Sequence, residues 1–255
     1  MEDQPTGCRN PAWTSTTFIL LCCCMVVDKA DQIMLPAVFL QICQTFNSGP
    51  AFLGTITLCR GVAQSAVAVW CGPLTARFDR VKIVGWGCVG WGCACFGCGL
   101  APTATALLFF RALNGVGLGL ALPVISAIVS DLFRPHERGR AFGCVSFMNS
   151  FGGVVGGAFA TVVAGGVVSG VAGWRFAFHV VGALSVLVGA LLLAFGVDPP
   201  PNNDENALPH LKRKITWTLF WGEFQHVLKL KTFQVIIAQV RCFLSYPFFQ
   251  NQSSC

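Results

Sequence analysis

Five charged residues lie inside long apolar stretches of this sequence, where a charge is costly. Asp28, Lys29 and Asp31 fall in the first such stretch, Arg60 in the second and Arg111 in the fourth. An ionisable side chain at membrane depth costs about 2.5–3.5 kcal/mol on insertion scales, and by default it marks an ion or substrate pathway. A carboxylate that faces a guanidinium can exchange a proton or a sodium ion against it. These residue types therefore favour ion-coupled chemistry within a membrane.

Asp28 and Arg111 are expected at similar depth. With a rise of 1.5 Å per residue, Asp28 lies about 20 Å from the start of its stretch near Thr14. Arg111 lies about 9 Å from the start of its own stretch near Thr105, which descends from the opposite face. In a hydrocarbon core about 30 Å thick the two depths are close. If the first helix instead ended near Val27, its charges would lie at the level of the headgroups.

The elements that carry these residues are apolar segments of membrane-spanning length. Of the 255 residues, 54% are hydrophobic and 11% charged, against about 25% charged in soluble domains. Six segments reach the length of about 20 mostly apolar residues that a span requires: 14–40, 51–75, 83–100, 105–133, 141–165 and 174–197. We predict an all-α polytopic membrane protein, with a six-helix bundle over residues 14–197 and a partial seventh helix.

Three further regions flank this bundle. Residues 1–13 are expected to be a cytoplasmic N-terminus, and residues 198–232 a cytoplasmic linker with an amphipathic interfacial helix at Trp217–Leu230. Residues 233–255 would hold the beginning of a seventh helix, to about Phe249, and a tail. The sequence carries no typical cleavable signal, because acidic Glu2 and Asp3 precede the first apolar run.

The basic residues indicate orientation rather than nucleic-acid binding. They cluster in the connections after the second, fourth and sixth segments, whereas the intervening loops at 47–50, 102–103 and 166–173 carry no lysine or arginine. The positive-inside rule places the N-terminus and the basic connections in the cytoplasm. Membrane lipids are thus an expected partner and nucleic acid is not.

Cysteines and motifs give no sign of metal, cofactor or catalysis. The 14 cysteines lie mainly within apolar runs, where free cysteine behaves as a small hydrophobe. Cys95 and Cys98 have CxxC spacing, but no second pair accompanies them, so packing is favoured over metal binding. The sequence contains no HExxH, GxSxG or P-loop motif. We expect neither a cofactor nor an enzyme.

Glycines mark the expected packing surfaces. Small residues at intervals of four let membrane helices approach closely. The fourth and fifth segments are therefore expected to pack most closely, through three such pairs: Gly115 with Gly119, Gly152 with Gly156, and Gly153 with Gly157.

Several motifs together resemble the N-terminal half of a major facilitator superfamily transporter. GPLTARFDRVK (residues 72–82) is similar to the loop motif of that family, although Ala76 stands where an acidic residue is usual. RALNGVG (111–117) is similar to its fourth-helix motif R-x-x-x-G-x-G. ERGRAFG (137–143), FGGVVGGAFA in the fifth segment, without the usual proline, and GWRFAF (173–178) add to the likeness. DKAD and RALNG further resemble the Spinster-like branch.

The resemblance implies a secondary transporter of a small molecule, with the first and fourth helices lining a central cavity. Asp28 or Asp31 is then expected to face Arg111 and to exchange a proton or a sodium ion. A structural ion pair is the alternative, and for Arg60 snorkelling to the headgroups is as compatible as pathway contact. The expected pathway residues are Asp28, Asp31, Arg60, Gln64, Arg111 and Asn114.

The resemblance also implies a cytoplasmic gate around the loop motif. Asp131, which is flanked by arginines, could pair with Arg77 or Arg80, and without an acidic residue at position 76 such a gate would be weaker or would use Asp79. The alternative is that these arginines only set orientation. The expected gate residues are Gly72, Arg77, Asp79, Arg80, Asp131, Arg138 and Arg140.

The family implies twelve helices, whereas six and part of a seventh are expected here. A truncated gene model or splice form would explain this. Such a chain would transport only as a dimer or with a complementary half. The other hypothesis is a scaffold that does not transport, or a regulatory partner of a full-length transporter.

Overall fold

The computed structural model describes residues 15–49, 51–168 and 170–199. The chain divides into two compact units, Met1–Glu205 and Asn206–Cys255, and every described residue belongs to the first. The expected amphipathic helix at 217–230 and the seventh helix at 233–249 lie outside the described residues.

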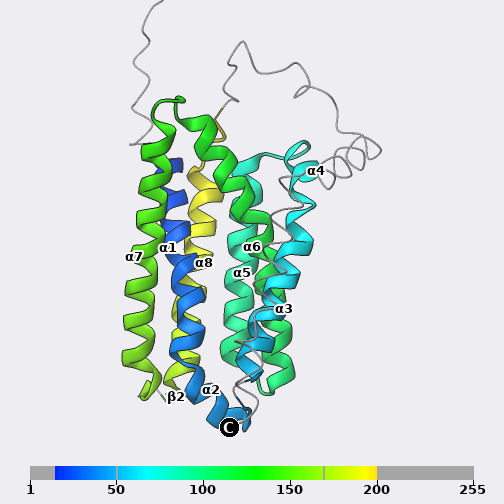
Figure 1. Ribbon diagram of the computed structural model, residues 1–255, viewed down its shortest axis with the longest axis vertical. Coiled ribbons are helices and arrows are strands. Elements are labelled where there is room, and N and C mark those ends of the chain that lie inside the picture. The colour runs from blue at the N-terminus through cyan, green and yellow to red at the C-terminus, as the bar shows by residue number, and fades with distance from the viewer. Residues whose placement is uncertain (1–14, 50, 169, 200–255) are drawn as a thin grey trace, which may run out of the picture. The chain divides into compact units, whose positions relative to one another are not determined.

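Six long helices make up most of the described part (Figure 1). Five of them are long and apolar enough to cross a membrane. The remaining long helix, α1, is the one that carries Asp28, Lys29 and Asp31. Their bounds are α1 Thr16–Ala37, α3 Ala51–Ala68, α5 Arg80–Leu100, α6 Ala104–Leu132, α7 Arg138–Ala164 and α8 Gly173–Phe195.

Two of the predicted segments are interrupted. The first was expected to reach residue 40, but α1 ends at Ala37, and after Val38 a short helix α2 runs over Phe39–Phe46 to Asn47, whose φ is 49°. Pro36 in the last turn of α1 lacks the amide that would continue the hydrogen-bond ladder. The second was expected to reach residue 75, but α3 ends at Ala68 and Cys71–Thr75 forms the separate helix α4.

A small hairpin joins α7 to α8. Strand β1 (Val167–Val168) pairs antiparallel with β2 (Val171–Ala172), in the register Val167 to Ala172. Gly170 lies in the turn with a φ of +80°, a left-handed conformation that glycine adopts without a steric penalty. The sequence indicated only a loop at 166–173, because two-residue strands leave no readable alternation.

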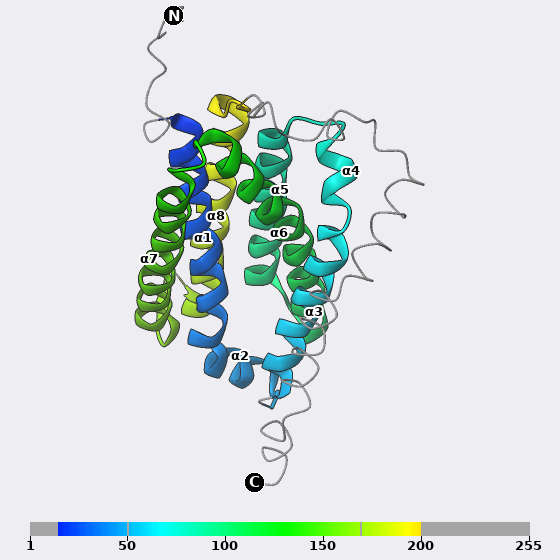
Figure 2. The same ribbon diagram turned by 45° about the horizontal axis from the view of Figure 1, so that its top comes forward.

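The helices are neighbours in an order that differs from their order in the chain. α1 lies between α7 and α8, α8 also packs on α5, α5 on α6, and α6 on α3 (Figures 1 and 2). α1 and α8 are further tied at their ends, where Thr17 Oγ1 donates to the carbonyl of Val197 and accepts from its amide, both at 3.0 Å. The first and last described helices therefore meet.

The glycine pairs make close contacts, but with other helices than expected. A Cβ added at Gly115 or Gly119 would collide with the backbone carbonyls of Arg60 and Gln64 on α3. On α7, Gly152 lies in the same way against Val26 on α1, and its partner Gly156 lies against Ala30. The expectation that the fourth and fifth helices provide the closest packing thus needs correction. Their glycine faces pack on α3 and α1, because GxxxG specifies a close approach and not the partner.

Gly153 and Gly157 lie beside the contact that Gly152 and Gly156 make with α1. A Cβ at Gly153 would lie 3.2 Å from Cγ of Lys29, and one at Gly157 would lie 2.9 Å from Cγ2 of Ile33. These two glycines therefore make room for side chains of α1, whereas Gly152 and Gly156 make room for its backbone.

Candidate functional site

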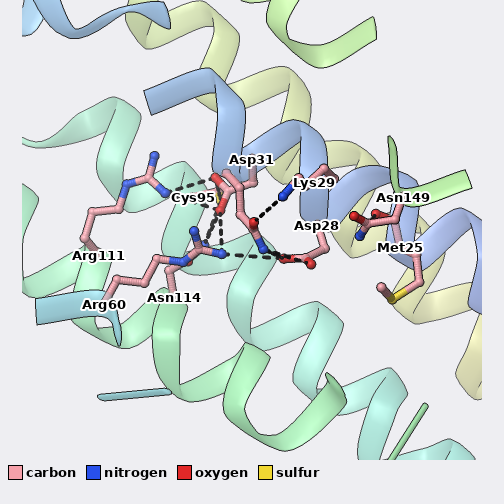
Figure 3. Close-up of polar contacts among 10 residues, drawn as sticks. Met25, Asp28, Lys29, Asp31, Arg60, Cys95, Arg111, Asn114 and Asn149 are labelled. Atoms are coloured by element: carbon pink, nitrogen blue, oxygen red, sulfur yellow. Dashed lines mark hydrogen bonds and ion pairs between the residues drawn. The ribbon is translucent and has the colours of Figure 1, made fainter. Parts of the chain in front are cut away.

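A fully buried carboxylate, Asp31, lies at the centre of the charged residues within the bundle (Figure 3). Nη1 of Arg111 donates to both of its oxygens, at 3.1 and 3.2 Å. Nδ2 of Asn114 donates to Oδ2 at 3.2 Å, and the Cys95 thiol donates to Oδ1 at 3.3 Å. Asp31 on α1 thereby connects α1 to α5 and α6.

Asp28 lies one turn earlier on α1 and is held by different donors. Nε2 of Gln32 donates to its two oxygens at 3.2 and 3.1 Å. Nη2 of Arg60, on α3, lies 3.5 Å from Oδ1 of Asp28 and 3.8 Å from Oδ2 of Asp31. Arg60 thus bridges the two carboxylates. We call Asp28, Asp31, Arg60 and Arg111 the buried charge cluster.

Arg111 is enclosed on all sides. Its side chain is 0% exposed, and its guanidinium carbon lies 4.6 Å from the centroid of the Phe178 ring on α8, within the range of a cation–π contact. Its Nε and Nη2 have no hydrogen-bond partner among the described residues. A buried donor without a partner costs free energy, so the cluster is not fully satisfied.

Backbone packing sets the positions of these side chains. Gly115 follows Asn114 on α6 and lies against the carbonyl of Arg60, so the missing side chain at 115 is what lets α3 bring Arg60 to the carboxylates. Gly117 on the same helix lies against the backbone of Gly87 and Trp91 on α5. The same two close approaches that join the helices therefore also assemble the cluster.

The structure brings together five of the six residues expected along the pathway. Of the two aspartates that could face Arg111, Asp31 does so, while Asp28 contacts Arg60. Gln64 lies elsewhere on α3, with its backbone against Gly119. Sequence analysis missed Gln32 and Cys95. Gln32 lies four residues after Asp28 on the same helix, which is a readable hydrogen-bonding interval. Cys95 stood out only by its CxxC spacing with Cys98, which says nothing about a contact with Asp31.

A second group of charges lies where α5 and α7 begin and where α6 and α8 end. Arg80 forms ion pairs with Asp131 and with Asp198, the latter at 2.9 Å from Nη2 to Oδ1. Asp198 also accepts from the backbone amide of Arg80 at 3.0 Å, a favourable place for a carboxylate because it caps the N-terminus of α5. We call Arg80, Asp131 and Asp198 the Arg80 cluster.

The other residues expected at a gate lie around this cluster. Gly72 and Arg77 are exposed, and Asp79, the N-cap residue of α5, pairs with Lys82 in the first turn of that helix at 2.6 Å. Nε of Arg138 donates to the carbonyl of Ser130 at 2.8 Å, and Arg140 is exposed near the start of α7. Sequence analysis missed Asp198, because it lies 118 residues from Arg80 at the edge of a polar segment.

The sequence matches the Major Facilitator Superfamily over residues 20–251. The chain belongs to this superfamily. It is therefore an integral, multi-pass, all-α membrane protein of a transporter family, as its motifs indicated.

Individual members of the superfamily resemble parts of the chain. It is 29% identical to Multidrug resistance protein 3 of Bacillus subtilis (strain 168) over 146 residues, which are 57% of this chain and 26% of that protein. It is also 29% identical to the puromycin resistance protein pur8 of Streptomyces alboniger over 198 residues, 74% of this chain and 38% of that protein. The chain thus spans well under half the length of these relatives.

A solved structure confirms the superfamily fold. The described helices superpose on a bacterial homolog of the human lysosomal transporter Spinster, in an inward-facing and occupied conformation, with a TM-score of 0.66 at 24% identity. The match covers 78% of this chain and 47% of that one.

Proposed function

We propose that the chain forms part of a secondary active transporter for a small molecule, in which the buried charge cluster couples transport to a proton or sodium gradient. The observation that carries this proposal is the contact of three helices, α1, α3 and α6, through two carboxylates and two guanidinium groups inside a bundle of apolar helices. Charges at that depth are costly, and an interhelical ion pair can be rearranged when helices rock against one another.

The two carboxylates have different parts in this proposal. Asp31 accepts hydrogen bonds from three residues and holds α1 to α6. Asp28 has weaker contacts and lies next to Arg60, which is 13% exposed. In this proposal Asp28 is therefore the group that binds and releases the coupling ion. The ion pair of Asp31 with Arg111 transmits the resulting rearrangement to the contact between α1 and α6.

The Arg80 cluster is proposed as the gate. It ties the start of α5 to the end of α6 and to the residues after α8, so opening this end of the bundle requires these pairs to separate. The positive-inside rule places this end, and with it the N-terminus, in the cytoplasm.

Proton movement into proteoliposomes tests the proposal. The chain is reconstituted with a pH-sensitive dye inside the vesicles, and puromycin, a lysophospholipid and benzoate are offered in turn, with and without a sodium gradient. We expect at least one of these three compounds to cause acidification of the vesicle interior or to be taken up in a sodium-dependent manner. Asp28→Asn should abolish that effect. Lys82→Gln, which removes an exposed charge, should leave it unchanged.

Two outcomes would count against the proposal. Uptake that is equal in Asp28→Asn and in the unchanged chain would exclude Asp28 from coupling. Absence of any flux, together with co-purification of the chain with a longer homologue, would instead support a regulatory partner of a transporter.

A further inference from the structure

The charged groups around Arg60 carry more positive than negative charge. Besides the buried charge cluster, α1 presents Lys29, whose Nζ donates to Oε1 of Gln32 at 3.2 Å, and Gln32 in turn donates to Asp28. Lys29, Arg60 and Arg111 thus bring three positive charges to this region, against two negative charges on Asp28 and Asp31. Figure 3 shows these side chains converging from three helices. Because an excess of positive charge attracts anions and repels cations, this arrangement favours a negatively charged occupant.

Arg60 is the cation best placed to receive that occupant. Its two contacts with carboxylates, at 3.5 and 3.8 Å, are longer than the roughly 2.7–2.9 Å of a good charge-assisted hydrogen bond. Its Nε is buried and has no hydrogen-bond partner among the described residues. Its side chain is 13% exposed, whereas that of Arg111 is 0% exposed. Arg60 thus has a donor without a partner among the described residues and a side chain that is not fully enclosed.

We propose that Arg60 binds an anionic oxygen group of the ligand, a carboxylate, sulfonate or phosphate, in exchange for Asp28, and that Asp28 takes up one proton as it is released. The inference rests on the proposed function, since it names the ligand class for the same cluster. One negative charge and one proton enter together, so the net charge of the cluster is unchanged. No covalent bond forms or breaks.

Binding of the anion and of the proton are then coupled in both directions. A proton on Asp28 removes the competitor for Arg60, and an anion on Arg60 removes the cation that stabilises the Asp28 carboxylate. The two affinities must change by the same factor, because coupling between sites is reciprocal. The ligand therefore binds more tightly as the pH falls.

The other charged and titratable groups near Asp28 belong to four helices. On α1 they are the Cys24 thiol, Lys29 and Asp31, on α3 Arg60, on α5 the Cys95 and Cys98 thiols and on α6 Arg111. On the two remaining long helices, the described charged or titratable residues other than cysteine lie near the ends: Arg138 and Arg140 on α7, and Arg175 and His179 on α8. Asp28 is the carboxylate that Arg60 approaches most closely.

Equilibrium binding to the purified full chain tests this inference. The probes are benzoate and benzenesulfonate as anions, benzamide as a neutral analogue and benzylammonium as a cation, each measured by calorimetry in detergent at pH 5.5 and 7.5. We expect the two anions to bind and the other two not to. As the pH is lowered from 7.5 to 5.5, the dissociation constant of the anion should decrease by up to about tenfold per pH unit, which is the limit for one coupled proton. Benzenesulfonate stays ionised throughout, so its own titration contributes nothing.

Variants separate the parts of the exchange. Asp28→Asn should bind the anions more tightly and without pH dependence, an outcome that a purely structural ion pair would not give. Arg60→Gln should abolish anion binding, whereas Arg60→Lys should retain it with weaker affinity. The lysine variant shows whether the loss of binding in Arg60→Gln comes from the loss of positive charge. Arg175→Gln, on α8 at the far end, should bind as the unchanged chain does.

Binding of benzamide as tight as that of benzoate, or weaker anion binding in Asp28→Asn, would overturn the inference. Because binding needs no ion gradient, the result is independent of the flux assay. Anion binding without coupled flux would overturn only the proposed function, and coupled flux of a neutral probe without anion binding would overturn only this inference.

Discussion

Gly115 on α6 lies directly against the backbone carbonyl of Arg60 on α3. The position of Arg60 therefore depends on a missing side chain on another helix. The residue is part of the R-x-x-x-G-x-G motif, so the motif supplies both Arg111 and the contact that brings Arg60 to the same carboxylates.

Gly115→Ala should push α3 away from α6 and draw Arg60 from Asp28. We expect a loss of about 1–3 kcal/mol in the free energy of unfolding, as for overpacked cores, together with loss of anion binding. Unfolding in mixed micelles with increasing SDS measures the first quantity. The control is Gly143→Ala on α7, where an added Cβ meets no atom within 4 Å. Equal effects of the two substitutions would contradict the packing argument.

Arg111→Gln should be strongly destabilising, because it leaves Asp31 buried without its charged partner. Breaking a buried pair on one side costs about 3–5 kcal/mol. The double variant Asp31→Asn/Arg111→Gln should recover part of that loss, since no buried charge remains unpaired. A double-mutant cycle by SDS unfolding measures the coupling. Strictly additive effects would show that the two side chains do not interact.

Asp198→Asn should weaken the contact between the start of α5 and the end of α8. We expect a loss of about 1–2 kcal/mol, towards the lower end for hydrogen bonds to charged groups because the Asp198 side chain is 27% exposed. The difference in thermal midpoint from the unchanged chain should shrink in 1 M KCl, which screens the pair. Arg77→Gln, on an exposed residue of the preceding turn, is the control. A salt-independent loss would point to packing instead of charge.

The orientation can be read from protease protection of inserted tags. A tag after His136, in the turn between α6 and α7, should be protected in intact cells, and a tag after Gly170, in the hairpin, should be cleaved from outside. The first turn joins α6 to α7, and the second joins β1 to β2 between α7 and α8. The opposite pattern would invert the proposed orientation and place the Arg80 cluster outside the cytoplasm.

Much of the architecture was predictable because it follows from composition. Long apolar segments fixed the six long helices, and the depth of Asp31 and Arg111 in their helices allowed them to meet. Which aspartate meets Arg111 was not readable, since Asp28 and Asp31 are three residues apart and point to neighbouring sides of one helix. Which aspartate meets Arg111 depends on the rotation of α1 about its own axis relative to α5 and α6, and this rotation cannot be predicted from the sequence of α1 alone.

The partners of the glycine seams and of Arg80 were not predictable for a related reason. Gly115 and Gly152 each indicate a close approach, but helix neighbours are decided by the whole bundle, in which α1 lies between α7 and α8. Asp198 belongs to a polar stretch with no periodicity, so its contact with Arg80 could only be seen once the ends of α5 and α8 were placed together.

The sequence separation within the buried charge cluster bears on how the protein is made. α1 carries three charged residues and leaves the ribosome before its counter-charges exist, because Arg60 follows Asp28 by 32 residues and Arg111 follows Asp31 by 80. At about 5–20 residues per second, Arg111 is synthesised on the order of 4–16 s after Asp31. During that interval each of these charges costs about 2.5–3.5 kcal/mol on insertion scales if α1 lies in lipid by itself. We therefore expect the insertion machinery to retain α1 until α6 is available to it.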